Sequence, residues 1–287
     1  MWLADNWIDY EVLDTGDGEK LERWGDIILR RPDPQVIWQK SNDKLWQNAH
    51  GHYHRSQTGG GQWEMLKKMP ERWTINFQSL AFHIKPMGFK HTGLFPEQAT
   101  NWSWMMDKIQ NANRPIKVLN LFAYTGGATV AAAQAGAEVC HVDASKGMVA
   151  WAKENMALSN LSSSPVRFIV DDVIKFVQRE SRRGKKYDGI IMDPPSYGRG
   201  PNGEIWKIED ELMPLLNSCR EILSDNPLFF ILNSYTTGLA PTVLRNVLNV
   251  TLQKTFGGQS LSDEIGLPIT KSKLLLPCGA TGRWENS

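Results

Sequence analysis

The chain has 287 residues, enough for one large domain or for one domain with a small additional module. Hydrophobic residues make up 41% and charged residues 22%, and the net charge of +1 excludes a strongly basic coat that would bind nucleic acid without selectivity. No apolar run approaches the roughly 20 residues that cross a bilayer. The N-terminus has neither a basic region nor a long apolar segment, as a signal peptide would. We therefore expect a cytoplasmic protein that makes no membrane contact.

The cysteines are few and widely spaced, at Cys140, Cys219 and Cys278. No two of them form a C-x-x-C pair, so the sequence indicates neither a zinc site nor a disulfide framework. We expect no metal, and the sequence leaves the oligomeric state open.

Residues 1–75 are predicted to form a small antiparallel β module. Short strand-like segments lie at residues 10–14, 26–30 and 36–38, separated by Gly- and Pro-containing turns, and residues 14–30 could form a hairpin. Seven of the twelve tryptophans precede residue 75. We interpret them as core filling, with platforms for stacked bases as the alternative. The module carries no recognisable RNA-binding signature.

The second predicted domain covers residues 76–287, and its first part, residues 76–115, forms a junction. A strand is expected within residues 75–84 and a helix over residues 99–111. Between them lies a polar segment, F-K-H-T-G-L-F-P-E-Q, at residues 89–98.

Residues 116–143 organise the second domain. A continuous apolar run at residues 116–122 is typical of a parallel strand buried on both faces. The Gly-containing turn at residues 124–127 then interrupts it. A helix is predicted over residues 128–135 and a second strand over residues 138–142, which ends at Asp143. This order is typical of a nucleotide-binding half-unit, in which the acid accepts hydrogen bonds from ribose hydroxyls.

Strands and helices continue to alternate after Asp143. Helices are predicted at residues 145–160, 173–182, 209–223 and 242–252, and strands at residues 166–170, 187–192 and 228–232. Residues 256–277 are consistent with a final antiparallel pair. The alternation predicts an α/β fold with a doubly wound, mostly parallel sheet. Asp143, Asp172 and Asp193 follow three successive strands, at the edge where such sheets bind ligands.

Taken together, residues 84–235 resemble the class I S-adenosylmethionine (SAM) methyltransferases, in the family that includes the 23S rRNA cytosine-C5 methyltransferase-like proteins. The segments that carry the resemblance are F-K-H-T-G-L-F-P-E-Q, N-L-F-A-Y-T-G-G-A-T, H-V-D-A-S-K, D-D-V-I-K-F and Y-D-G-I-I-M-D-P-P-S-Y-G-R-G. The resemblance implies a Rossmann-like sheet of seven strands, with SAM as the cofactor.

The resemblance also implies which residues contact the cofactor. The methionine moiety would be wrapped by the turn residues Phe122, Ala123, Tyr124, Thr125, Gly126 and Gly127. Asp143 would hold the ribose diol, with Ala144 and Ser145 beside it. Asp172 and Val173 would face the adenine. The segment from Thr92 to Gln98 would cap the pocket, with Gln98 as its contact.

The D-P-P-S-Y segment implies a catalytic loop made of Asp193, Pro194, Pro195 and Tyr197. Methyl transfer requires in-line placement of the nucleophile and a site for its departing proton. A backbone carbonyl between the prolines can accept from a planar amino group, and an aromatic ring can stack on the heterocycle. Ser196, Arg199 and Lys207 are expected to contact the substrate. Five basic residues within 179–186 could hold phosphates, or could simply be cations near a helix C-terminus.

One departure from the family limits the prediction. Methylation of a pyrimidine at C5 requires a Cys thiolate, which the related enzymes place after the fourth or fifth strand. This chain has Ser196 and Asn233-Ser234-Tyr235 there, and Cys219 is expected in the core. We therefore predict a SAM-dependent methyltransferase that acts on an rRNA-like RNA at a nitrogen. The alternatives are a protein or small-molecule methyltransferase, a SAM- or RNA-binding protein without turnover, and a nicotinamide dehydrogenase, which the missing G-x-G-x-x-G disfavours.

Overall fold

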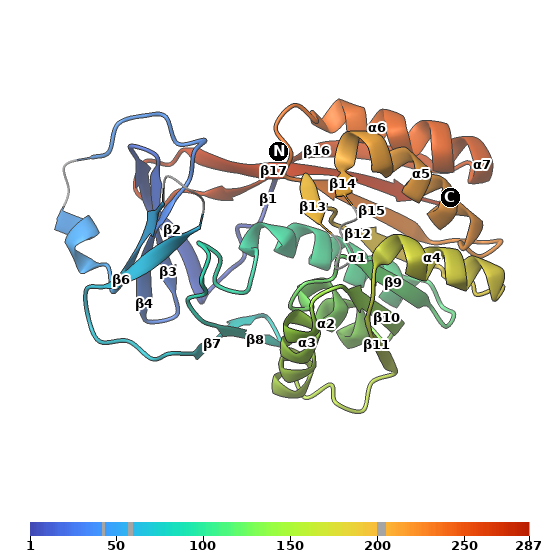
Figure 1. Ribbon diagram of the computed structural model, residues 1–287, viewed down its shortest axis with the longest axis horizontal. Helices are drawn as coiled ribbons and strands as arrows, with labels where there is room; N and C mark the ends of the chain where they lie inside the picture. Colours follow the sequence, from blue (N-terminus) through green and yellow to red (C-terminus); the bar gives the residue numbers. More distant parts are fainter. Residues whose placement is uncertain (42–43, 57–59, 200–204, 287) are drawn as a thin grey trace. The chain divides into compact units, whose positions relative to one another are not determined.

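The computed structural model describes residues 1–41, 44–56, 60–199 and 205–286 (Figure 1). The chain divides into two compact units. The first comprises residues 1–2, 100–265 and 278–287, and the second comprises residues 3–99 and 266–277. The second unit thus extends past residue 75, the predicted limit of the module. None of the helices in the described ranges is long and apolar enough to cross a bilayer.

The first unit is built on a mostly parallel sheet. Its strands lie in the order β1-β16-β17-β15-β12-β9-β10-β11. Five of these strands run parallel: β9 (Lys117–Leu121), β10 (Glu138–Asp143), β11 (Val166–Val170), β12 (Gly189–Met192) and β15 (Phe229–Ser234). The remaining three are β1 (Trp2–Leu3), β16 (Gln259–Pro268) and β17 (Leu275–Glu285), of which β17 is antiparallel to β15. The predicted sheet had seven strands, and the eighth is the two-residue β1.

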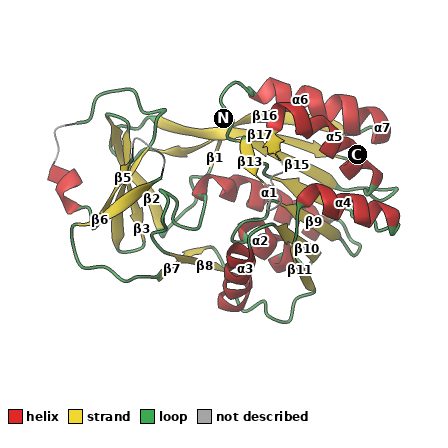
Figure 2. Cartoon of the chain, viewed as in Figure 1, coloured by secondary structure: helices red, strands yellow, loops and turns green. Residues whose placement is uncertain are grey.

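Helices cover both faces of this sheet (Figure 2). They are α1 (Ala99–Asn111), α2 (Gly127–Gln134), α3 (Lys146–Leu158), α4 (Val173–Arg182), α5 (Ile208–Glu221), α6 (Pro241–Leu248) and α7 (Lys254–Phe256), with a π-helical turn, η3 (Asn249–Gln253), between the last two. The apolar faces of α4, α5 and α6 form one core with alternate strand residues such as Leu119, Ile190 and Phe230. Because side chains alternate across a strand, the intervening residues face the other layer.

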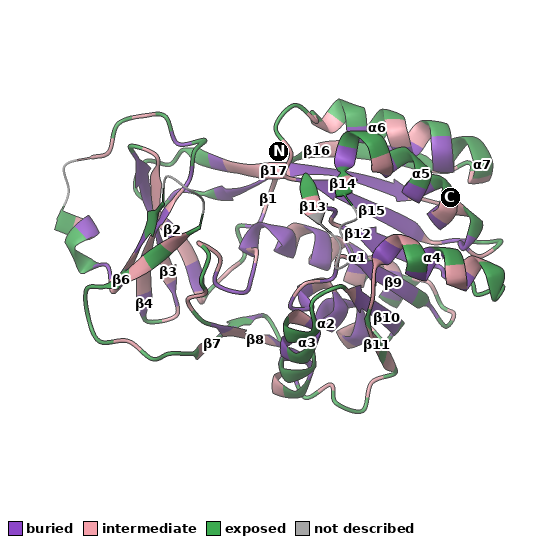
Figure 3. Cartoon of the chain, in the orientation of Figure 1, coloured by how far each residue is buried: buried purple, intermediate pink, exposed green. Residues whose placement is uncertain are grey.

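The central strands β12 and β15 are buried along their whole length, as Figure 3 shows. That burial explains why they are continuous apolar runs and could be recognised in the sequence. The register places the carboxyl ends together, with Leu121 between Val142 and Met192 and with Asp143 beside Val170. The loops that follow these strands therefore gather at one edge of the sheet.

The second unit contains a five-stranded sheet in the order β2-β3-β4-β5-β6 and a separate hairpin, β7–β8. All neighbours are antiparallel except β4 and β5. The strands are β2 (Tyr10–Gly16), β3 (Glu19–Trp24), β4 (Ile27–Pro32), β5 (Gly51–Arg55), β6 (Gly61–Met65), β7 (Trp73–Phe77) and β8 (Leu80–Ile84). Two 3-10 turns, η1 (Lys44–Asn48) and η2 (Pro96–Gln98), complete it.

Three predictions for this unit differ from the structure. Residues 36–38 are not a strand, although their apolar side chains favoured one. The expected hairpin at residues 14–30 is part of a three-stranded meander, because the highly charged Glu19–Trp24 segment forms β3. The single strand expected within residues 75–84 is instead most of the hairpin β7–β8, which turns at Gln78 with a φ of 52°.

The tryptophans of the second unit are used internally. Trp24 is fully buried. Others donate their indole N–H within the unit: Trp7 to Pro96 O, Trp38 to Thr15 Oγ1, Trp46 to Asp14 Oδ2, Trp63 to Met87 O and Trp73 to Trp24 O. A buried indole normally finds such a partner. These contacts favour the core-filling interpretation over base-stacking platforms.

Candidate functional site

The turn after β9 has an unusual backbone. Phe122 and Tyr124 have positive φ angles of 55° and 51°, and Gly126 has 83°. Left-handed conformations in non-glycine residues cost free energy and persist only where surrounding contacts impose them. Here Ala123 N donates to Val142 O at 3.1 Å, and Gly126 N donates to Ala123 O at 3.0 Å. The sheet edge therefore fixes a sharply bent turn at the position predicted for the methionine moiety.

Asp143 fixes the same turn from the neighbouring strand. Its Oδ2 accepts from Tyr124 N and its Oδ1 accepts from Ser145 N, both at 2.8 Å. Burial raises the pKa of the Asp143 carboxyl, although these two hydrogen bonds lower it in part. Each oxygen retains a lone pair, so the half-buried carboxylate can still accept from a pair of vicinal hydroxyls.

The glycines of the turn allow close packing. A Cβ at Gly127 would lie 2.6 Å from the ring of Trp102, and a Cβ at Gly126 would lie 2.8 Å from Cβ of Ala152. Both distances are too short for real contacts. The glycines thus bring the turn against α1 and α3, a packing role in addition to the predicted contact with the cofactor.

A series of hydrogen bonds between buried polar groups supports the turn. Asn155 Nδ2 donates to Thr125 O at 2.9 Å. Asn120 Nδ2 donates to Thr129 Oγ1 at 3.0 Å, which leaves the threonine hydroxyl to donate to His141 Nδ1 at 2.9 Å. Burial holds the pKa of His141 at about 3, so the ring is neutral. These hydrogen bonds could not be predicted from the sequence, because a polar residue inside an apolar strand or helix does not indicate which residue it contacts.

Asp172 begins helix α4. Its Oδ1 accepts from Lys175 N at 2.9 Å, as an N-cap does, while Val173 is buried in the first turn. Within the described ranges, Asp172 Oδ2 has no hydrogen-bond partner. The N-cap role therefore leaves one oxygen available for the amine contact that the sequence predicts. Ala144 and Ser145 are exposed, and Ser145 caps α3 through Met148 N.

The loop predicted to be catalytic follows β12, next to the turn that follows β9. Trp206 Nε1 donates to the Pro195 carbonyl at 2.6 Å, and its ring lies 5.3 Å from that of Phe122. Trp206 belongs to β14 (Ile205–Lys207), which pairs with β13 (Tyr197–Arg199). Trp206 was missed in the sequence, where its only signal is an aromatic residue ten positions after a D-P-P-S segment. It joins the two turns that the resemblance assigns to cofactor and substrate.

The loop is also anchored to the ends of two further elements. Ser196 Oγ lies 2.6 Å from Thr236 Oγ1, beyond β15, and Ile208 N at the start of α5 donates to Ser196 O at 3.1 Å. By contrast, none of the described residues donates to the Pro194 carbonyl. The loop is therefore held through Pro195 and Ser196, while one carbonyl between the prolines keeps its acceptor capacity.

The predicted substrate contacts lie around this loop. Tyr197 is 51% exposed and pairs with the exposed Lys207 in the β13–β14 register. Ser196 is exposed but already bonded to Thr236. The side chain of Arg199 lies outside the described part of the structure.

Most of the basic cluster of residues 179–186 lies toward the other edge of the sheet, although Arg179 reaches back to Asp171 at the end of β11. Helix α4 starts at the carboxyl edge with Asp172 and runs back, and β12 then starts at Gly189, beside Val118 near the amino end of β9. Arg179 forms an ion pair with Asp171, Arg183 with Glu180, and Lys186 donates to Glu221 O. These contacts favour the interpretation as cations near a helix C-terminus over a phosphate site beside the catalytic loop.

The remaining predicted residues bear on the site less directly. Gln98 is buried in η2, in the second unit, so its role as a cap of the cofactor pocket remains a prediction. Cys219 is fully buried in α5, where burial raises the pKa of its thiol, as expected for a core residue. The loop after β12 carries Ser196, and β15 ends at Ser234 and is followed by Tyr235, so none of these positions is a cysteine.

Comparison with known proteins gives the family. The sequence model of the S-adenosylmethionine-dependent methyltransferases matches residues 36–223, more than half of the chain. The chain is 32% identical over 236 residues to the ribosomal RNA large subunit methyltransferase K/L of Shewanella frigidimarina, an alignment that covers 77% of this chain and 31% of that protein. The same protein of Shewanella oneidensis is 28% identical over 237 residues, with 78% and 31% covered. The chain thus spans about a third of the length of these relatives.

Solved structures agree with this family. A SAM-dependent methyltransferase from Agrobacterium tumefaciens superimposes with a TM-score of 0.94 at 39% identity, covering 99% of this chain and 93% of that chain. A methyltransferase from Streptococcus mutans, at 20% identity and a TM-score of 0.73, covers 98% and 76% and shares the fold. The predicted fold class and family are confirmed. The chain belongs to the S-adenosylmethionine-dependent methyltransferases, and SAM is its cofactor.

Proposed function

We propose that this methyltransferase modifies RNA, of an rRNA-like kind, at a nitrogen of a base. The observation that carries the proposal is the hydrogen bonding of the catalytic loop. Trp206 Nε1 donates to the Pro195 carbonyl, whereas none of the described residues donates to the Pro194 carbonyl. A planar amino group needs such an acceptor to orient its hydrogens. Attack by a ring carbon would need a thiolate instead, and no cysteine stands in this loop.

The cofactor contacts are part of this proposal. The bent turn from Phe122 to Gly127 would hold the methionine moiety, and Asp143 would accept from the two ribose hydroxyls. The remaining oxygen of Asp172 would accept from the adenine amine, beside Val173. Ala144 and Ser145 would line the ribose. An acid at this edge, with no G-x-G-x-x-G phosphate cradle before it, fits a nucleoside without phosphates.

Methyl transfer requires the protein mainly to place the substrate correctly relative to SAM. SAM, when bound, supplies an activated methyl group. Asp193 and the Pro194 carbonyl would accept hydrogen bonds from the acceptor amine, which aims its lone pair and offers a site for the departing proton. Tyr197, half exposed at the loop, would stack on the base. Ser196, Arg199 and Lys207 would contact the substrate around it, and Lys207 and Arg199 would meet its phosphates.

The RNA substrate rests on the relatives, whose names state that they methylate large-subunit rRNA. The near-neutral net charge is compatible with a selective RNA contact and gives no general affinity for polyanions. An rRNA substrate also agrees with the cytoplasmic location predicted from the sequence, which remains part of this proposal.

Transfer of labelled methyl from SAM to separated rRNA, tRNA and protein fractions tests the proposal, with each fraction assayed before and after RNase treatment. We expect the label to appear in the rRNA fraction and to become acid-soluble after RNase treatment. Label confined to protein or to small molecules would overturn the RNA assignment. Tight SAM binding without label in any fraction would indicate a binding protein without turnover.

A further inference from the structure

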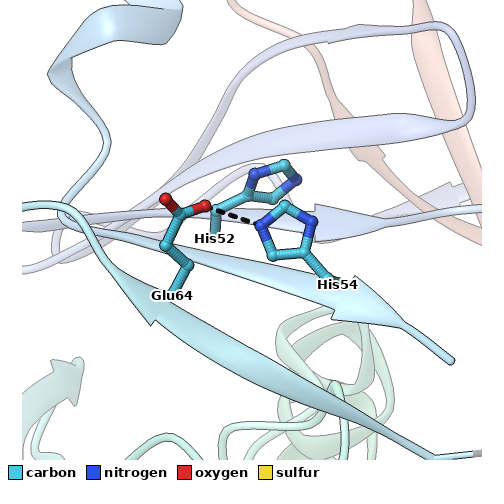
Figure 4. A group of neighbouring side chains, drawn as sticks. All are labelled: His52, His54 and Glu64. Atoms are coloured by element: carbon cyan, nitrogen blue, oxygen red, sulfur yellow. Dashed lines mark hydrogen bonds and ion pairs between the residues drawn. The ribbon is translucent and has the colours of Figure 1, made fainter.

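A group of potential metal ligands lies in the second unit, on the sheet β2–β6. His52 and His54 are two residues apart on β5, so both side chains leave the same face of the sheet. Glu64 on β6 pairs directly with His52 and shares that face. One ligand atom from each of the three residues lies within 4.8 Å of the other two. Figure 4 shows the two rings and the carboxylate turned toward one another.

The tautomer of His52 is set by a carboxylate on its other side. His52 Nε2 lies 2.7 Å from Glu19 Oε1. Arg30 Nε and Lys40 Nζ also donate to Glu19 Oε2, so Glu19 is an ionised carboxylate held between cations. Because an ionised carboxylate can only accept, His52 Nε2 carries the hydrogen. In the neutral ring with its hydrogen on Nε2, the lone pair is on Nδ1 and is available to a metal ion.

The other two side chains can adjust their positions. His54 Nε2 lies 2.7 Å from Glu64 Oε2, and the side chains of His54 and Glu64 are 45% and 54% exposed. The rings of His52 and His54 are only 3.9 Å apart between centroids. At typical metal–ligand distances of about 2.0–2.1 Å, tetrahedral ligand atoms lie about 3.3 Å apart. A small inward rotation of the two exposed side chains would bring the three atoms to that spacing.

We propose that His52 Nδ1, His54 Nε2 and a Glu64 oxygen bind a divalent first-row transition-metal ion, best matched by Zn²⁺, with a further position open to water. Two imidazoles and one carboxylate are ligands that Zn²⁺ accepts in three-residue sites. Glu19 would act as a positioning residue, since a carboxylate that holds the distal N–H of a ligand histidine fixes its ring and raises its basicity.

Proton and charge balance are compatible with this assignment. Neutral His54 binds by moving its hydrogen from Nε2 to Nδ1 through solvent, and a protonated His54 releases one proton. The ion would face the positive charges of Arg30 and Lys40, which the Glu19 carboxylate offsets in part. The Glu64 carboxylate then partly neutralises the ion itself.

Titration calorimetry with ZnCl₂ tests the site on the full, untagged chain after removal of metals by chelation. We expect one ion per chain. His54→Ala and Glu64→Gln should each weaken binding at least tenfold, and Glu19→Gln should weaken it by roughly 10- to 100-fold. His83→Ala and Glu71→Gln are the matched controls, because they alter the same residue types elsewhere in the unit, and both should bind as the unaltered chain does.

Two further readouts keep the test decisive. Co²⁺ in place of Zn²⁺ should give an intense visible spectrum typical of four-coordinate nitrogen and oxygen ligation, and this spectrum should disappear in His54→Ala. Circular dichroism of the metal-free variants should match that of the unaltered chain, which separates lost binding from lost folding. The proposal is overturned by the absence of saturable Zn²⁺ binding, or by binding that the cluster variants and the control variants share equally.

Discussion

The indole N–H of Trp206 donates to the carbonyl of Pro195 at 2.6 Å, while the ring of Trp206 packs against Phe122. One side chain thus spans the loops that follow β12 and β9, two neighbouring parallel strands. The relationship explains how a loop with two consecutive prolines can be held in place without using the Pro194 carbonyl. It also makes Trp206 a positioning residue for the proposed methyl transfer.

Replacing Trp206 by Phe should slow methyl transfer more than it weakens SAM binding. The substitution keeps an aromatic ring near Phe122 but removes the donor to Pro195, a hydrogen bond worth about 1 kcal/mol. We expect kcat to fall by about fivefold and the Kd of SAM to change by less than threefold. Single-turnover transfer and calorimetric SAM binding measure the two quantities.

Trp73→Phe is the control for that comparison, because it also removes an indole donor to a backbone carbonyl, that of Trp24. It should leave kcat unchanged within twofold. Equal kcat values for Trp206→Phe and the unaltered enzyme would refute the positioning role.

Asp143→Ala should weaken SAM binding strongly. The change removes the proposed ribose contact, worth roughly 2–4 kcal/mol, and also the acceptor for Tyr124 N and Ser145 N. Asp143→Asn keeps one of the two acceptor oxygens, so its SAM affinity should lie between that of Asp143→Ala and that of the unaltered chain. Calorimetry with SAM measures both, with the exposed Asp210→Asn as control. A folded Asp143→Ala variant with unaltered SAM affinity would rule out the ribose assignment.

The sequence predicted those elements whose pattern follows directly from burial. Strands β9, β12 and β15 are mostly apolar because helices cover both of their faces. The acids Asp143, Asp172 and Asp193, which end or follow β10, β11 and β12, mark the edge where the sequence predicts the ligand. The strand β3 was missed because four of the six residues in Glu19–Trp24 are charged, and its two apolar residues, Leu21 and Trp24, lie three apart and lack the alternation typical of a strand. Trp206 could not be assigned because its partners, Pro195 and Phe122, are brought to it by tertiary structure alone.

The buried His141 should make stability depend on pH. Its pKa in the folded chain is about 3, against roughly 6.5 when unfolded, so the unfolded state binds the proton more readily. Stability should therefore fall as the pH drops from about 6.5 toward 3, by up to about 1.4 kcal/mol per pH unit from this group. Urea unfolding at pH 7, 6 and 5 measures the slope. His141→Asn should give a shallower slope than the unaltered chain. The same slope in His141→Asn as in the unaltered chain would contradict the assignment.

Cys219→Ala should retain turnover within about twofold. The thiol is fully buried in α5, so its loss should cost roughly 1 kcal/mol of stability through packing alone. Initial rates and urea unfolding of the two proteins provide the comparison. An RNA substrate containing 5-fluorocytidine should form no covalent complex that survives denaturation, because such an adduct requires a nucleophilic cysteine. A stable adduct, or a Cys219→Ala variant that is folded but inactive, would contradict this prediction and favour methylation at a ring carbon.

The identity of the methylated nucleoside tests the central claim most directly. Ribosomal RNA treated with the enzyme and SAM is digested to nucleosides and analysed by mass spectrometry, beside a reaction with Asp193→Asn. We predict a base methylated at nitrogen in the first reaction and its absence in the second, although the variant still binds SAM. A methyl group on carbon, such as 5-methylcytidine, or equal product from Asp193→Asn, would contradict the proposed roles of the Asp193-Pro194-Pro195 loop.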